Sequence, residues 1–213
     1  MKSYVLSLFA LLWGIPLHAQ QPAPAPSAGP AFPVPQAHAG QILFSAAPVP
    51  PDGYARAAYI GYGTYALTPE SRLYLTAFLI TSLPNALARL APAAQRTNFV
   101  KRGSFQYCFF VDDVLVYTAY LQPDPQYLAE RDVQPVLHQP LITPETSRKK
   151  NQSLWGHFLT NGGKKALPNG SHLLRLVIRP YLLSPLLQVG PVLAVGQVAL
   201  NVTTHALPAE RPR

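Results

Sequence analysis

The sequence predicts a mainly β fold: a single-domain antiparallel two-sheet β-sandwich, Ig-like or jelly-roll-like, that follows an N-terminal signal peptide and a Pro-rich arm. Three observations predict this fold. Short apolar segments, many with alternating side chains, recur along residues 41–207. Clusters of Gly, Pro and Asn separate these segments, and an amphipathic helical period is almost absent. Short strands between turn residues are typical of two packed sheets.

Residues 1–19 have the three parts of a cleavable signal peptide. Lys2 supplies a positive charge, residues 4–15 are apolar, and residues 16–19 form a short segment that ends in the small residue Ala19. The apolar stretch is shorter than the ~20 residues that a membrane-spanning helix needs. We therefore expect cleavage before Gln20 and a secreted or periplasmic mature protein without a transmembrane segment.

Residues 20–40 are rich in Pro and Ala, with Pro spaced too closely for a helix or a sheet strand. This composition predicts an extended, disordered arm. The β-sandwich domain is expected over residues 41–207, and residues 208–213 are expected to form a short disordered tail.

Apolar alternation predicts strands in the first part of the domain. Residues 41–46 form a short apolar run that suits an edge strand. Residues 56–67 are rich in Tyr and Gly, and a period of two places Tyr59 and Tyr65 on one face. In residues 73–81, the side chains that would point to either face of an extended strand are apolar, which predicts a strand buried on both faces.

The next elements are a helix and a hairpin. Residues 85–90 form the best short helix of the chain. Residues 105–111 and 114–121 are two β-rich segments that meet at Asp112-Asp113. Two strands separated by two turn-forming residues predict a β-hairpin.

Four further strands are expected towards the C-terminus, over residues 133–138, 154–160, 171–180 and 192–203. Asn-Gly and Gly-Gly pairs between them supply turn residues. The passage from Ser153 to Leu182 resembles strands of exported β-sandwich accessory modules. This resemblance covers less than a fifth of the chain and implies a fold, not an activity.

Composition limits the class of protein. The chain is 48% hydrophobic and 12% charged, against about 25% charged in an average domain, which excludes a charged disordered polymer. The formal net charge of +8 favours general attraction to anionic surfaces, but no basic helix face predicts specific binding of nucleic acid. Cys108 is the only cysteine, so no internal disulfide can form, and its aromatic neighbours predict a buried apolar role.

Signatures of reaction chemistry are absent from the sequence. There is no G-x-S-x-G, H-E-x-x-H, glycine-rich phosphate loop or C-x-x-C. We therefore expect no cofactor and no metal, and favour a protein that is not an enzyme. The alternative is a hydrolase or metal-dependent enzyme, which requires Asp112 and Asp113 to converge with His157 and His172.

Aromatic and basic residues predict binding. Tyr and Trp combine flat apolar rings with polar tips, which suits stacking on sugars or contact with a protein. The leading hypothesis is an exported, non-catalytic binding or accessory module that recognises a glycan or a protein partner at the cell envelope. The residues expected to bind are Tyr59, Tyr65, Trp155, Arg148, Lys149 and Lys150. A third hypothesis is a structural subunit of an envelope assembly that docks through its arm.

Overall fold

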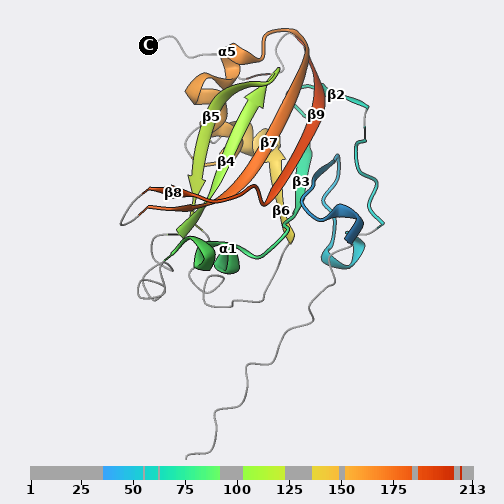
Figure 1. Ribbon diagram of the computed structural model, residues 1–213. Helices are drawn as coiled ribbons and strands as arrows, with labels where there is room; N and C mark the ends of the chain where they lie inside the picture. The colour runs from blue at the N-terminus through green and yellow to red at the C-terminus, as the bar shows by residue number, and fades with distance from the viewer. Residues whose placement is uncertain are drawn as a thin grey trace, which may run out of the picture.

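The structure, a computed structural model, describes residues 36–54, 56–61, 63–91, 103–122, 136–148, 152–183, 187–203 and 207. It is mainly β, with two sheets (Figure 1). The described chain begins inside the range predicted for the arm, with a short 3-10 helix η1 (Gln36–His38). The predicted signal peptide, the rest of the arm and the predicted tail lie outside the described residues.

The small sheet has three strands in the order β1 (Ile42–Ser45), β3 (Leu73–Phe78) and β6 (Val136–Ile142), all antiparallel. The predicted edge strand near residue 41 is confirmed as β1. The buried strand near residue 73 is confirmed as β3, in which every residue except Tyr74 is buried.

The large sheet has the order β2-β9-β7-β4-β5, with β8 also paired to β7. Its strands are β2 (Thr64–Leu67), β4 (Gly103–Val111), β5 (Val114–Leu121), β7 (Gly170–Leu182), β8 (Gln188–Val189) and β9 (Ala194–Val202). The predicted hairpin is confirmed: β4 and β5 meet at Asp112 and Asp113, which both have positive φ.

Two sequence-based expectations about the large sheet are wrong. The sheet is not wholly antiparallel, because β2 pairs with β9 in parallel. A long stretch of chain separates these two strands, which leaves room for the crossover that parallel pairing needs. The strand expected over residues 56–67 is confined to β2, and residues 57–61 form no strand.

The strand expected over residues 154–160 is also wrong, because this segment is helical. α4 (Leu154–Phe158) continues into a π-helical turn, η4 (Leu159–Gly163), and a short α5 (Lys164–Ala166). The Ser153 hydroxyl caps α4 by accepting the Gly156 N–H at 2.9 Å. Trp155 and Phe158 lie three residues apart on the buried face of the helix, a spacing that the short apolar run did not distinguish from strand alternation.

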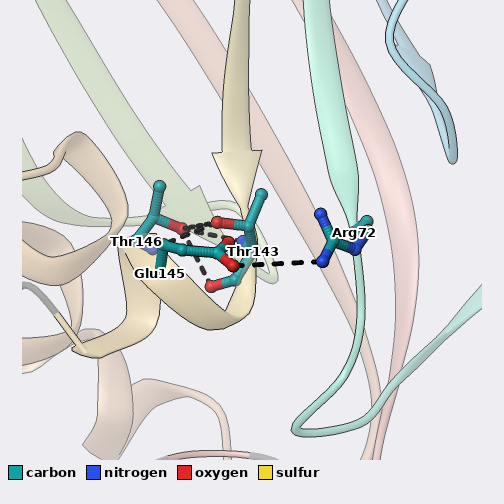
Figure 2. A network of polar contacts seen from close by, with 4 residues as sticks. All are labelled: Arg72, Thr143, Glu145 and Thr146. Atoms are coloured by element: carbon teal, nitrogen blue, oxygen red, sulfur yellow. Dashed lines mark hydrogen bonds and ion pairs between the residues drawn. The ribbon is translucent and has the colours of Figure 1, made fainter.

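Two other helices close the ends of the fold. The predicted helix is confirmed as α1 (Leu83–Leu90), which begins after Ser82 and packs Leu83 and Leu87 into the core. α3 (Pro144–Arg148) follows β6, and Figure 2 shows the polar contacts at its start. There the Thr146 hydroxyl accepts the Thr143 N–H at 2.7 Å, and an Arg72–Glu145 ion pair of 3.9 Å links the helix to the start of β3.

One hydrophobic core joins the two sheets, α1 and α4. Trp155, Phe158 and Phe109 are among its largest fully buried side chains, and the rings of Phe109 and Phe158 stack at 4.8 Å. The free Cys108 is buried, as the sequence predicts, but it lies outside this cluster because its side chain points to the opposite face of β4.

The two sheets differ in what covers their outer faces. On the small sheet, Phe78 points away from the core cluster yet is fully buried, because the rings of His38, Tyr54 and Tyr59 pack against it. The segments that carry these three rings, at the 3-10 helix η1, at the 3-10 helix η2 (Pro51–Gly53) and at residues 56–60, therefore form a cover on that sheet. The large sheet lies in front of the small sheet and α4 in Figure 1, and no described helix or strand packs on its outer side.

Candidate functional site

The outer face of the large sheet is the candidate site. We use this name for the side chains of β4, β5 and β7 that point away from the core: Ser104, Gln106, Cys108, Phe110, Leu115, Tyr120, Arg175, Val177, Arg179 and Tyr181. Along β4, Phe105, Tyr107, Phe109 and Val111 enter the core cluster, so the residues between them face outward. Leu115 is 53% exposed and Tyr120 51% exposed, which leaves large apolar groups open to a ligand.

An aromatic pair lies across β4 near one end of this face. Tyr120 of β5 and Tyr181 of β7 bring their ring centroids to 4.4 Å, with 47° between the ring planes. β4 runs between these two strands, and its Ser104 and Gln106 are buried in spite of facing outward. The two rings therefore cover β4 at this point and form an aromatic platform.

Arg179 lies beside the aromatic platform. It is two residues before Tyr181 on the same face of β7, and its register partner on β4 is Gln106. The Gln106 amide nitrogen donates to the Tyr120 hydroxyl at 3.4 Å. The Nε atoms of Arg179 and of Arg175 are both buried and have no hydrogen-bond partner among the described residues. A positive charge and two phenol rings thus lie together on this face, with the buried Gln106 amide beneath them.

A second arginine, Arg175, has its charge compensated. Its guanidinium lies 4.1 Å from the centroid of the Phe110 ring, and one terminal nitrogen is 3.2 Å from the Asp113 carboxylate. Cation–π contact and ion pairing both hold this side chain in place. Arg175 and Arg179 are four residues apart on the same face of one strand, but only Arg175 has a carboxylate partner in the described part of the chain.

A cleft of about 430 Å³ borders the outer face at β9. Val195, Gln197 and Ala199 of β9 line it, opposite residues 41–44 and 60–61. Val195 of β9 is the register partner of Val177 of β7, so the cleft lies beside the β7 side of the outer face. The open surface therefore extends from the edge strand β5 to β9.

The aromatic residues predicted from the sequence lie elsewhere. Trp155 was expected on the surface, but it is 0% exposed because it is part of the core, so it offers no ring to a ligand. Tyr65 packs against the core, and its hydroxyl donates to the Arg72 carbonyl at 2.7 Å. Tyr59 is half-buried in the cover of the small sheet. The structure does not bring these three residues together on one surface.

Of the predicted basic residues, Arg148 ends α3, and Lys149 and Lys150 lie outside the described residues.

The residues of the alternative, enzymatic hypothesis converge only in part. The Asp112 carboxylate accepts hydrogen bonds from His172 Nδ1 and from the Leu173 N–H, both at 2.8 Å, and these bonds hold its pKa below the usual range. Asp113 turns to Arg175, and His157 belongs to α4. Among the described residues, no three His, Cys, Asp or Glu side chains gather as a metal site would require.

The Asp112–His172 pair serves a structural role. His172 Nε2 lies 3.0 Å from the Pro168 carbonyl oxygen, while Nδ1 faces the Asp112 carboxylate. Both ring nitrogens of His172 therefore face oxygen atoms of the protein. The pair fastens the β4–β5 turn to the start of β7.

The sequence did contain a signal for the outer face. Alternation along β4 and β5 places Gln106 and Tyr120 opposite the core-facing residues of the predicted hairpin. The contact of Tyr120 with Tyr181 depends on which strands are neighbours, and that order was not available from the sequence.

Comparisons with protein-family models, with curated proteins and with solved structures find no match to this chain. Within the described residues, no helix has the length and apolar character needed to span a membrane.

Proposed function

We propose that this protein is an exported, non-catalytic binding module that recognises a glycan at the cell envelope through the outer face of the large sheet. Export rests on the signal-like pattern of residues 1–19. The observation that carries the binding proposal is the Tyr120–Tyr181 platform, in which Tyr120 is 51% exposed, with Arg179 beside it. We infer an Ig-like or jelly-roll-like sandwich as the finer description of the fold.

Several features favour a glycan as the ligand. Sugars present apolar faces that stack on aromatic rings and hydroxyls that bond to planar polar side chains. The outer face offers both kinds of group, side by side and on rigid strands rather than loops. A protein partner at the same face remains an outcome of the test described next.

The test is a glycan array of envelope polysaccharides, followed by calorimetric titration with the best oligosaccharide. Replacing both Tyr120 and Tyr181 with Ala should weaken binding at least about tenfold, since aromatic anchors commonly contribute more than ~1 kcal/mol each. The matched control is Tyr59→Ala, which removes a Tyr that the sequence favoured but that lies on the other sheet. Circular dichroism checks that both variants fold.

Unchanged affinity in the double variant, or a loss of affinity in Tyr59→Ala alone, would contradict the assignment of the outer face. If the protein binds an envelope protein and no glycan, the ligand is a protein and the glycan proposal is wrong. Cleavage of any bound glycan during the titration would contradict the non-catalytic role.

A further inference from the structure

We propose that the glycan recognised by the outer face is acidic, and that Arg179 binds the carboxylate of a uronic acid unit. This inference rests on the proposed function, because it names the chemical class of the ligand for the same surface. It starts from the difference between the two arginines of β7.

Arg179 carries a charge that the described part of the protein leaves unpaired. No carboxylate within the described ranges forms an ion pair with it. The Nε atoms of Arg179 and Arg175 are both buried without an acceptor, so the two arginines differ in the carboxylate partner and not in this nitrogen.

Arg175 marks the contrast on the same strand and face. Asp113 neutralises its charge at 3.2 Å, and Phe110 supports the guanidinium. The other carboxylate of the β4–β5 turn, Asp112, is taken by His172 and the Leu173 N–H. The acidic side chains of this turn are therefore occupied, and none of them serves Arg179.

The surroundings of Arg179 suit a uronic acid more than a simple anion. A guanidinium binds a carboxylate with two parallel N–H bonds, which fixes the orientation of the ligand. The Tyr120–Tyr181 platform beside it can stack on the sugar ring that bears this carboxylate. Gln106 lies buried beneath the platform, where its amide nitrogen donates to the Tyr120 hydroxyl at 3.4 Å and holds that ring in place.

The overall charge supports the same ligand class. The formal net charge of +8 attracts a polyanion over long range, while a single uncompensated arginine on the outer face gives it a place to bind. General electrostatic attraction weakens steeply as the salt concentration rises. Binding of a carboxylate at Arg179 depends instead on that one side chain.

The test uses pairs of oligosaccharides that differ only in charge: oligomers of galacturonic, glucuronic and mannuronic acid, each with its neutral methyl ester. We expect the full exported chain to bind at least one acid about tenfold or more tightly than its ester at physiological salt. Arg179→Gln should abolish this preference, so that the acid and its ester bind with about equal affinity. Arg175→Gln is the matched control and should keep the preference.

Equal binding of acid and ester, or a preference that survives Arg179→Gln, would overturn the inference. If neutral glycans bind in a way that depends on Tyr120 and Tyr181, the proposed function stands while the acidic ligand is refuted. If no sugar of either kind binds, the proposed function fails as well. Equal loss in both arginine variants would indicate general attraction to polyanions and would also refute a specific role for Arg179.

Discussion

At the scale of single residues, His138 shows how the cover of the small sheet is held in place. The Val49 N–H donates to His138 Nε2 at 3.3 Å, so Nε2 has no proton. Nδ1 then carries the proton and donates to the Thr76 hydroxyl at 2.9 Å. Thr76 also hydrogen-bonds Tyr59, whose hydroxyl donates to the Tyr54 carbonyl at 2.9 Å. This chain of bonds requires a neutral imidazole.

A pH dependence of stability follows from this arrangement. Burial lowers the pKa of His138, and protonating Nε2 would set it against the Val49 N–H donor. The unfolded chain binds this proton near pH 6.5, before the folded protein does. Stability should therefore fall as the pH drops below about 6.5 and level off below the folded pKa.

The measurement is the thermal midpoint of unfolding between pH 7.5 and pH 5. We expect His138→Gln, which cannot titrate, to flatten the fall in this range, while His157→Gln on α4 retains it. The rings of Tyr54 and Tyr74 pack against His138. His38 packs on Phe78 of the same sheet, so His38→Gln is a second control. A fall that persists unchanged in His138→Gln would contradict this explanation.

At the scale of elements, the junction of β1 and β9 joins the two sheets. The Val195 N–H donates to the Gly40 carbonyl at 2.9 Å, and Gln41 forms a bridge with Val195. The backbones are so close here that a Cβ on Gly196 would lie 2.0 Å from the Ile42 carbonyl oxygen. Only glycine fits, since this clash is with backbone rather than with a mobile side chain.

Gly196→Ala should therefore destabilise the fold by about 3 kcal/mol, at the upper end of the usual cost of overpacking. Gly61→Ala is the matched control, because a Cβ there meets no atom within 4 Å, and its effect should stay within about 0.5 kcal/mol. Urea denaturation of both variants gives these differences. Equal stability of the two variants would show that β1 and β9 do not approach as described.

The elements differ in how well the sequence predicted them. The β4–β5 hairpin was predictable because two turn-forming residues separate two long alternating segments. α4 was not, because a helix of five residues is too short to establish a helical period and its Trp and Phe also suit a strand. The parallel pairing of β2 with β9 joins distant segments, and local pattern carries no information on such pairing.

At the scale of the whole molecule, the described elements cover the outer side of the small sheet, while no described helix or strand packs on the outer side of the large sheet. The rings of His38, Tyr54 and Tyr59 pack on the small sheet, and Phe78 is buried there. On the large sheet, Tyr120 and Leu115 are about half exposed. Sequence patterning predicted that aromatic residues would serve as a binding surface, but it selected Tyr59 and Trp155, because only the packing of the two sheets determines which aromatic residues stay accessible.

The central claim is that the outer face of the large sheet binds the ligand without altering it. The most direct measurement is a backbone-amide NMR titration with the oligosaccharide selected on the array, following the ligand signals in the same samples. We predict shift changes at Gln106, Tyr120, Arg179 and Tyr181, with intact ligand throughout. Shift changes confined to the cover of the small sheet, or centred on Asp112 and His172 with cleavage of the ligand, would contradict the account.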